Sequence, residues 1–244
     1  MRTKPSTQVY SNYTQEDFEV WNILFNRQMK NLENHVSLDF LQALEKVKFT
    51  RDKIPDFNQV NTILKQQTGW GLHTVPCISE QPEFFKRLSQ QQFTSTCWLR
   101  SKAELDYLEE PDMFHDVFAH TPLLSNVAYT QFFKSIGNLA IKHLHNPDII
   151  KKLGRLYWFT IEFGLMYENR NMKIFGAGII SSAGETKNAL RNKTRKIDFD
   201  MHKVFNTDFR TDIMQETYFV IDSFDQLLSA IPQIEEAVEE LCTQ

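Results

Sequence analysis

Residues 111 to 124, PDMFHDVFAHTPLL, carry the strongest signal in the chain. The segment is largely apolar, places His115 and His120 five residues apart, and reaches Pro122, which cannot continue a helix. Because neutral imidazole binds iron, zinc and copper, a histidine pair indicates one edge of a metal site. Residues five apart on an α-helix lie about 140° apart around its axis, so we expect His120 on a loosened last turn. Alone, the pair also fits two ordinary hydrogen-bonded histidines.

A second segment, LYWFTIEFGL at residues 156 to 165, places Glu162 inside an apolar helix. A buried carboxylate must be paired, hydrogen-bonded, protonated or bound to a metal, unless it faces outward or meets an arginine. Two histidines and one carboxylate form the facial triad that leaves coordination positions open on iron. No cysteine lies near the pair, which disfavours a closed structural zinc site. A rival pair, His143 and His145, lies about 200° apart on a helix and is interpreted as surface or core residues.

A third segment, GAGIISSAGE at residues 176 to 185, superficially resembles a dinucleotide-binding loop. Its glycine spacing differs from G-x-G-x-x-G, and no long series of parallel βαβ units surrounds it. We therefore interpret these glycines as points of close backbone approach.

Helical periodicity dominates the first third of the chain. Thr14 and Asp17 predict a capping box, with Asp in place of the usual Glu or Gln. Ser37 is expected to cap a second helix, and a third is expected over residues 57–67 with Gly69 at its end. The first helix carries one apolar stripe at spacings of three and four: Phe18, Trp21, Phe25, Met29 and Leu32.

The rest of the chain combines short strands with helices. Pro82 suits the first residue of a short helix. The pattern is helical again from residue 111 to about residue 167, with breaks at Pro122 and Pro147. With no repeat or flexible linker, we predict a single domain that is mostly α with a minor β component. Strands rich in β-branched and aromatic residues are expected over residues 72–75, 93–99, 172–175 and 218–221.

Composition places the chain among globular proteins. Of its 244 residues, 41% are apolar, and 20 Phe with 4 Trp exclude disorder. The net charge of −4 leaves no broad basic field for nucleic acid. No apolar run is long enough to span a membrane, and the N-terminus lacks the apolar stretch of a secretory signal. Cys77, Cys97 and Cys242 are far apart, which suits reduced thiols in the cytoplasm.

At these motifs the sequence resembles the bacterial phenylalanine 4-hydroxylases, which belong to the pterin-dependent aromatic amino acid hydroxylases. Residues 111–124 match the iron-binding segment of that family, residues 157–165 its carboxylate segment, and residues 176–185 a third signature. The resemblance implies a basket-like catalytic domain, mostly helical with a short β component. The similarity runs from about Tyr13 to Phe224 and includes shorter matches at Ile54–Phe57, Thr68–Trp70 and Leu105–Leu108.

The resemblance implies roles for individual residues around iron and substrate. Arg100 would hold the substrate carboxylate, because a guanidinium meets a carboxylate with two charge-assisted hydrogen bonds. Glu185 would pair with Arg100, and Ser181 would orient an iron-binding histidine. Without the resemblance, these would be an ordinary ion pair and a helix cap. Ferrous iron would be bound by His115, His120 and Glu162, and the substrate ring would lie against Pro111, Trp158 and Phe163.

The resemblance also implies a pterin side of the site. Phe84 would stack on the pterin, the stretch Cys77–Ser79 with Ile78 would supply backbone contacts, and Asp116 and Tyr157 would complete it. Without the resemblance, aromatic residues on helices are interpreted as ordinary core.

One position departs from the family pattern, which usually has Gly before the second histidine, where this chain has Ala119. In a helix, Ala is favoured over Gly by about 1 kcal/mol, so we expect a neutral or slightly stabilising change. If close packing required Gly, the methyl group would instead displace His120.

The function that the resemblance implies is a monooxygenase that converts L-phenylalanine to L-tyrosine with Fe(II), O₂ and a tetrahydropterin such as tetrahydrobiopterin. Trp158 is typical of the phenylalanine and tyrosine branches. The alternatives are the same chemistry on tryptophan or tyrosine, a zinc hydrolase, and a catalytically silent amino-acid-binding protein. The intact set of metal ligands disfavours the silent protein. No catalytic residue is expected beyond the metal site.

For domain organisation, we expect a flexible N-terminus over residues 1–12 and a catalytic domain over residues 13–244. No regulatory domain is expected before it. Pro232 interrupts the last residues, so no long tetramerising helix is expected either. The sequence therefore predicts a cytoplasmic monomer whose partners are small molecules, with neither nucleic acid nor membrane among them.

Overall fold

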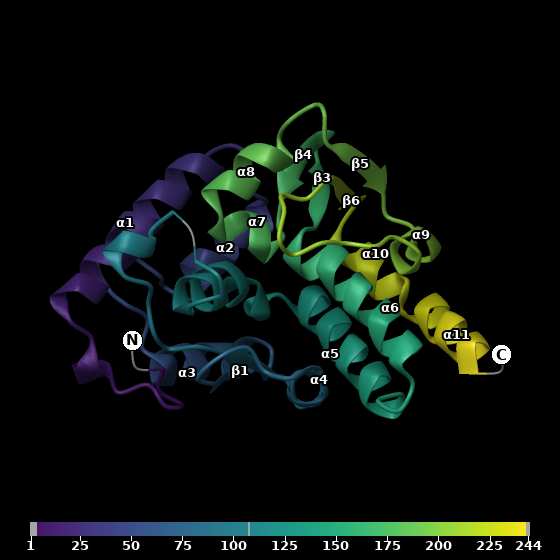
Figure 1. The fold of residues 1–244 in the computed structure, drawn as a ribbon, viewed down its shortest axis with the longest axis horizontal. Helices are drawn as coiled ribbons and strands as arrows, with labels where there is room; N and C mark the ends of the chain where they lie inside the picture. Colours follow the sequence, from purple (N-terminus) through teal and green to yellow (C-terminus); the bar gives the residue numbers. More distant parts are fainter. Residues whose placement is uncertain (1–3, 107, 243–244) are drawn as a thin grey trace.

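The computed structural model describes residues 4–106 and 108–242. Residues 1–3, Tyr107 in one of the family motifs, and residues 243–244 lie outside the described residues. Helices form most of the fold around short strands, and the two chain ends lie at opposite ends of its long axis (Figure 1). No helix among the described residues has the length and apolar character needed to cross a membrane.

The first three α-helices begin where the sequence predicts them. Thr14 and Asp17 form the reciprocal capping box at the first of them, and Ser37 accepts a hydrogen bond from the Phe40 N–H at the second. Trp21 is fully buried and meets the ring of Phe114 edge-on at 5.7 Å, so the first helix supports the metal segment directly. These helices are α1 (Gln15–Leu32), α2 (Leu38–Lys46) and α3 (Phe57–Gln67).

Residues 4 to 12, where we expected a flexible end, lie against the body of the protein. The Gln8 amide donates to the Pro55 carbonyl at 2.9 Å, and the Tyr10 hydroxyl donates to the Ile54 carbonyl at 2.9 Å. A short 3₁₀ turn, η1 (Tyr10–Asn12), leads into α1.

Two parallel strands, β1 (Gly71–Thr74) and β2 (Gln92–Ser95), enclose the helix α4 (Gln81–Ser89). The strand predicted over residues 93–99 is therefore shorter than expected. Its ladder ends with the hydrogen bond from the Val75 N–H to the Ser95 carbonyl at 2.9 Å, directly before Pro76.

The middle of the chain is helical but departs from regular α-helix where the metal-site motifs lie. Two segments are π-helical, η3 (Phe114–His120) and η5 (Trp158–Glu162). The connecting elements are η2 (Lys102–Glu104), η4 (Pro122–Ser125), α5 (Val127–Lys142) and α6 (Pro147–Tyr157), so the breaks predicted at Pro122 and Pro147 are confirmed.

A four-stranded sheet with the order β4-β3-β6-β5 follows the second π-helical segment. The helical pattern expected to continue to residue 167 is wrong beyond Glu162. A side-chain carbon at Gly164 would lie 2.2 Å from both the Phe175 ring and the Thr160 carbonyl oxygen, so a glycine ends the helix at a close approach. The strands are β3 (Leu165–Glu168), β4 (Asn171–Ile174), β5 (Arg195–Asp198) and β6 (Thr217–Ile221).

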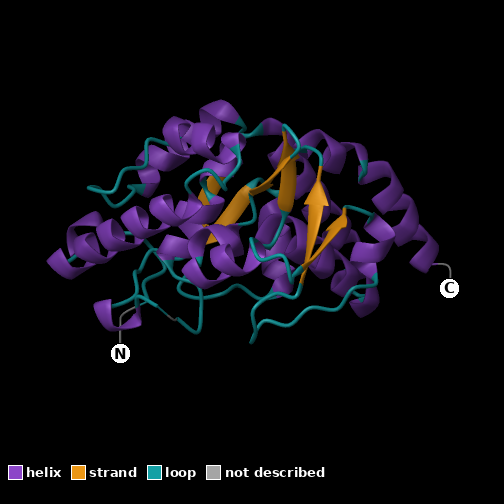
Figure 2. Ribbon diagram, turned by 90° about the horizontal axis from the view of Figure 1, so that it is seen from above, coloured by secondary structure: helices purple, strands orange, loops and turns teal. Residues whose placement is uncertain are grey.

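The remaining helices pack around this sheet, and the strands lie between helical layers (Figure 2). Pro232 lies in the first turn of the last helix, so it begins that helix and does not interrupt it. These helices are α7 (Ala177–Ser181), α8 (Ala183–Ala189), α9 (Met201–Phe205), α10 (Phe224–Ser229) and α11 (Ile231–Cys242).

Candidate metal centre

His115 and His120 are brought together by the π-helical geometry of η3. Backbone hydrogen bonds in a π-helix run between residues five apart, so side chains at that spacing lie one above the other. The two Nε2 atoms are 3.2 Å apart, and the rings are inclined at 79°. His120 lies on the last turn of the helix, as expected, but this turn is a π-helical one, and its register pairs the histidines.

Glu162 lies at the end of η5, which continues directly from α6. Its Oε1 lies 3.0 Å from Nε2 of His120, and its Oε2 lies 3.7 Å from Nε2 of His115. The Tyr157 hydroxyl, five residues earlier in the chain, donates to the same Oε1 at 2.8 Å. Glu162 is buried and meets no arginine among its described contacts, so it faces the two histidines.

The three side chains fit a metal ion. Neighbouring donors about 2.1 Å from one octahedral ion lie about 3.0 Å apart, close to the separations observed here. Among the described residues, His115, His120 and Glu162 are the group of histidine, cysteine and acidic side chains close enough to share an ion. Two nitrogens and one carboxylate oxygen are the donor set of non-haem iron(II) centres.

A hydrogen bond fixes the tautomer of His115. The Ser181 hydroxyl donates to the Ala177 carbonyl at 2.9 Å, so its oxygen accepts from Nδ1–H of His115, also at 2.9 Å. The lone pair on Nε2 of His115 is then free to bind a metal. The contact expected between Ser181 and an iron-binding histidine is present.

The ring of His120 also directs Nε2 at the candidate centre. Its Nδ1 is buried without a hydrogen-bond partner among the described residues, whereas Nε2 faces both other donors. The ring of Phe93 packs beside it with centroids 4.7 Å apart. Ala119 is helical and fully buried, which matches the helical case considered for this position.

Burial and close neighbours shift the pKa values of the ligand atoms. Burial raises the pKa of Glu162, but the facing histidines and the hydrogen bond from Tyr157 outweigh it and hold the pKa at about 2. Burial lowers the pKa of His115 to about 4, although Glu162 opposes that shift. The site thus holds a carboxylate beside a neutral imidazole, the forms that bind metals.

Arg100 lies beside this centre and pairs with Asp112, not with Glu185. Nε and Nη2 of Arg100 each donate to the Asp112 carboxylate at 2.9 Å, and the Arg100 N–H adds a third bond at 2.9 Å. The expected Arg100–Glu185 pair is therefore wrong. Asp112 is fully buried three residues before His115 and binds two nitrogens of the guanidinium.

Glu185 has a different set of partners. Its Oε1 accepts from the Gln215 N–H at 2.9 Å, and its Oε2 accepts from the Tyr218 hydroxyl at 2.6 Å. Burial raises the pKa of Glu185, and these hydrogen bonds oppose the shift. The carboxylate therefore ties α8 to the segment that leads into β6.

The aromatic residues expected around the substrate ring form one cluster next to Glu162. The rings of Trp158 and Phe163 lie 4.5 Å apart, and Phe209 stacks on Trp158 at 4.3 Å. Trp158 and Pro111 are half-buried, whereas Phe163 is buried. The Phe163 ring packs on Gly178, where a side-chain carbon would lie 2.7 Å from it.

The residues expected on the pterin side are brought together only in part. The rings of Phe84 and Tyr157 meet edge-on at 5.2 Å, which links Phe84 to the Glu162 side of the centre. Asp116 is buried and accepts from the Thr96 N–H at 2.7 Å and hydroxyl at 2.8 Å; burial raises its pKa to about 7 against these bonds. Ile78 is 63% exposed on the loop before α4.

The family model for the biopterin-dependent aromatic amino acid hydroxylases matches residues 4–241 of this chain. The chain belongs to this family. The match includes all three motifs, so the hydroxylase family and the His115–His120–Glu162 geometry point to the same centre.

Individual members of the hydroxylase family are similar over nearly the whole chain. The phenylalanine-4-hydroxylase of Chromobacterium violaceum is 40% identical over 224 residues, which cover 91% of this chain and 75% of that protein. A crystal structure of that enzyme with bound oxidised Fe(III) has a TM-score of 0.91 at 37% identity, covering 99% of this chain and 87% of the other. Another, with iron(III) and 7,8-dihydrobiopterin, has a TM-score of 0.89 at 38% identity, covering 98% and 86%.

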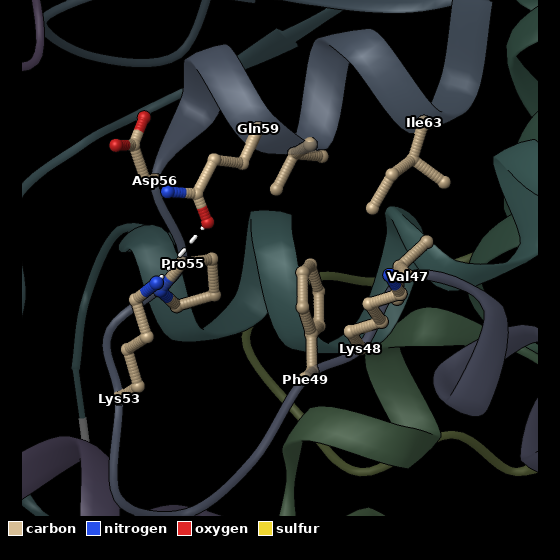
Figure 3. Close-up of a pocket in the computed structure, with 9 residues that line it drawn as sticks. Val47, Lys48, Phe49, Lys53, Pro55, Asp56, Gln59 and Ile63 are labelled. Atoms are coloured by element: carbon tan, nitrogen blue, oxygen red, sulfur yellow. Dashed lines mark hydrogen bonds between the residues drawn. The ribbon is translucent and has the colours of Figure 1, made fainter. Parts of the chain in front are cut away.

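Two surface hollows of this hydroxylase lie away from the metal centre. One is lined by the apolar side chains of Phe49, Val60 and Ile63 with Lys53 at its edge, where the Lys53 ammonium donates to Gln59 at 3.1 Å (Figure 3). The other lies beside Trp70. Neither is lined by a residue expected at the site.

Sequence reasoning missed two residues of the hydroxylase site. Asp112 was visible in the motif, and its position at the start of η3 is typical of a carboxylate that caps backbone N–H groups; it accepts from the His115 N–H at 3.3 Å. Gln215 lies far from every motif, and no local pattern indicates its contact with Trp158. His143 and His145 remain apart from the centre, and His143 meets Cys242 at 3.5 Å.

Proposed function

We propose that this protein is an iron- and tetrahydropterin-dependent monooxygenase that hydroxylates the ring of L-phenylalanine to L-tyrosine with O₂. The observation that carries the proposal is the convergence of His115, His120 and Glu162 within 3.0–3.7 Å in a member of the biopterin-dependent hydroxylases. Phenylalanine is the favoured substrate, because relatives named phenylalanine-4-hydroxylase match about nine-tenths of the chain.

His115, His120 and Glu162 would hold the iron(II) ion with three donor atoms, a donor set that leaves coordination positions open. When bound, iron(II) and tetrahydropterin together activate O₂ and supply the oxygen atom. His115 would offer Nε2 in the tautomer that Ser181 sets, and the Tyr157 hydroxyl would hold the Glu162 carboxylate in its orientation.

The substrate would be oriented at both of its ends. Nη1 of Arg100 has no acceptor among the described residues, so it remains available for the carboxylate of an amino acid while Asp112 holds the rest of the guanidinium. The aromatic ring would lie against Pro111, Trp158 and Phe163, of which Phe163 directly follows Glu162 in the chain. Two fixed ends set the ring at a defined place relative to the iron.

The pterin would lie against the ring of Phe84. Tyr157 is suited to border both the pterin and Glu162, because its ring meets Phe84 and its hydroxyl reaches Glu162. Asp116 and the loop at Ile78 would complete this side. Aromatic surfaces here would also exclude water from the reacting centre.

The test is tyrosine formation by the purified protein, loaded with Fe(II) and supplied with tetrahydropterin, O₂ and phenylalanine. We expect tyrosine from the wild type and none from His115→Ala. His143→Ala removes a histidine outside the centre and should retain full activity.

Other outcomes separate the alternatives. Tetrahydropterin oxidation without tyrosine, abolished in His115→Ala, would keep the centre and direct the test to tryptophan and tyrosine as substrates. Neither signal from iron-loaded protein would refute the proposed function. Hydrolysis by zinc-loaded protein without pterin or O₂ would favour a zinc hydrolase.

We also propose that residues 13–244 act as one catalytic domain and that the enzyme is a cytoplasmic monomer that binds no nucleic acid. The free state of Cys77, Cys97 and Cys242 supports a reducing compartment. The net charge of −4 supports the absence of nucleic-acid binding. Sedimentation equilibrium should give 28.7 kDa, and a stable dimer or tetramer would contradict the monomer.

A further inference from the structure

Both polar atoms of the Gln215 side chain form hydrogen bonds, although Gln215 lies in a loop. It is 6% exposed and lies between α9 and β6. Its Oε1 accepts from the Trp158 indole N–H at 3.0 Å, and its Nε2 donates to the carbonyls of Arg210 at 2.8 Å and Ile213 at 3.3 Å. One side chain therefore joins η5 to the loop beyond α9.

The hydrogen bond from Trp158 to Gln215 fixes the rotation of the indole in its own plane, which ring packing leaves free. Phe209 stacks on Trp158 with only 12° between the rings, and Phe163 lies against the indole at 38°. Stacked rings can turn or slide in their own plane at little cost, because aromatic pairs tolerate a range of offsets. The bond to Gln215 selects one edge of the indole and so defines where its remaining surface lies.

The acceptor itself is held in place from α8. The Gln215 N–H donates to the Glu185 carboxylate at 2.9 Å, and the Asn188 amide donates to the Gln215 carbonyl at 2.7 Å. The Tyr218 hydroxyl closes the group by donating to Glu185 at 2.6 Å and accepting from Asn188 at 2.8 Å. Glu185 thus holds Gln215, which in turn binds the Trp158 indole, and it does not pair with Arg100.

We propose that Gln215 is a positioning residue for the substrate pocket: by holding the Trp158 indole, it sets the width of the space in which the aromatic ring of the substrate lies. This inference rests on the proposed function. Trp158 packs on Phe163, the residue after Glu162, and makes none of the described contacts of the Glu162 carboxylate, so a turned indole would change the fit of the ring and leave the ligand atoms in place. Gln215 therefore acts on substrate affinity and on discrimination among aromatic rings.

The direct test is the indole N–H signal of Trp158 in a ¹H–¹⁵N spectrum of the metal-free protein. The chain has four tryptophans, and Trp158→Phe identifies the signal by its loss. Gln215→Met removes the acceptor and should move that signal upfield. Gln226→Met serves as the control, because the Gln226 side chain accepts from the Asp222 N–H at 2.8 Å and lies outside the site.

The functional test compares phenylalanine with the bulkier tryptophan in the iron-loaded enzyme. A neutral hydrogen bond corresponds to about a fivefold change, so Gln215→Met should raise KM for phenylalanine and lower the ratio of kcat/KM values, phenylalanine over tryptophan, by about fivefold. The kcat for phenylalanine should stay within about twofold. Gln215→Asn, whose amide is one methylene too short to reach the indole, should do the same with less disturbance if the Met variant folds poorly.

Each result decides a separate point. An unmoved Trp158 signal, or an unchanged ratio in a folded Gln215 variant, would overturn the positioning role. An equal loss of kcat for both substrates would assign Gln215 to general stability. Failure of the wild-type enzyme to form tyrosine in the same assay would instead count against the proposed function.

Discussion

The hydroxyl of Tyr157 donates a 2.8 Å hydrogen bond to Oε1 of Glu162, five residues further along the chain. His115 and His120 show the same spacing, with Nε2 atoms 3.2 Å apart. Both pairs lie at π-helical segments, in which a five-residue step returns to the same side of the helix. The same π-helical geometry therefore positions both parts of the centre, the histidine pair and the carboxylate.

Removing the tyrosine hydroxyl tests this support of Glu162. Tyr157→Phe keeps the ring packing but frees one carboxylate oxygen, and losing such a partner typically weakens metal binding by about 10-fold or more. Calorimetric titration with Co(II) should show that loss, with a fall in the free energy of unfolding of only about 1 kcal/mol. Tyr10→Phe removes a comparable 2.9 Å bond to the Ile54 carbonyl and should leave metal affinity unchanged. Unchanged affinity in Tyr157→Phe would contradict the supporting role.

The helices were predictable wherever local chemistry defines their ends. Thr14 with Asp17, Ser37 and Pro147 each begin a helix at the expected place. The π-helical register was not predictable, because apolar spacing alone does not distinguish i+4 from i+5 bonding. Strand β5 was missed because Arg195 and Lys196 lie on the edge of the sheet, where charged residues are favoured.

Gly176 and Gly154 provide a test and its control for the close backbone packing around Glu162. A side-chain carbon at Gly176 would lie 2.5 Å from both the Glu162 carbonyl oxygen and the Gly164 nitrogen, and both are backbone atoms that cannot turn aside. Gly176→Ala should therefore lower the free energy of unfolding by about 2 kcal/mol and weaken metal binding. Chemical denaturation and Co(II) titration measure the two effects.

The control is Gly154→Ala in α6, where the nearest neighbour of a new carbon among the described residues would be the Gln81 amide nitrogen at 3.9 Å. It should stabilise the helix by up to about 1 kcal/mol and leave metal binding unchanged. Equal effects of the two substitutions would show that the close approach at Gly176 has no special importance.

The thiols should differ sharply in reactivity. Cys97 is 3% exposed and burial raises its pKa to about 11, so at pH 8 it remains a protonated, inaccessible thiol. Cys77 and Cys242 are exposed. A disulfide reagent at pH 8 should therefore modify two thiols rapidly in the native protein and the third only on unfolding. Rapid reaction of Cys97, detected by peptide mapping, would show that the N-terminal segment, whose Pro5 carbonyl lies 3.6 Å from Sγ of Cys97, opens readily.

Some residues of the candidate site could be identified from the local sequence, and others only from the fold. The metal ligands and Ser181 were identifiable because each lies in a dense motif. The partner of Arg100 was not, since Asp112 and Glu185 are both acidic residues in motifs and only the fold shows which one reaches the guanidinium. Gln215 and Trp158 are 57 residues apart, so no sequence pattern could have paired them.

Asp112 should determine substrate binding through Arg100. Asp112→Asn leaves a buried guanidinium without its counter-charge, and breaking such a pair costs about 3 kcal/mol or more of unfolding free energy. KM for phenylalanine should rise at least about tenfold, whereas KM for 2-phenylethylamine, which lacks the carboxylate, should change little. Steady-state kinetics on both compounds measures this difference. Asp208→Asn, which removes the exposed partner of Arg155, should alter neither KM. An equal rise in KM for both compounds in Asp112→Asn would show that Asp112 stabilises the fold without orienting Arg100 toward the substrate carboxylate.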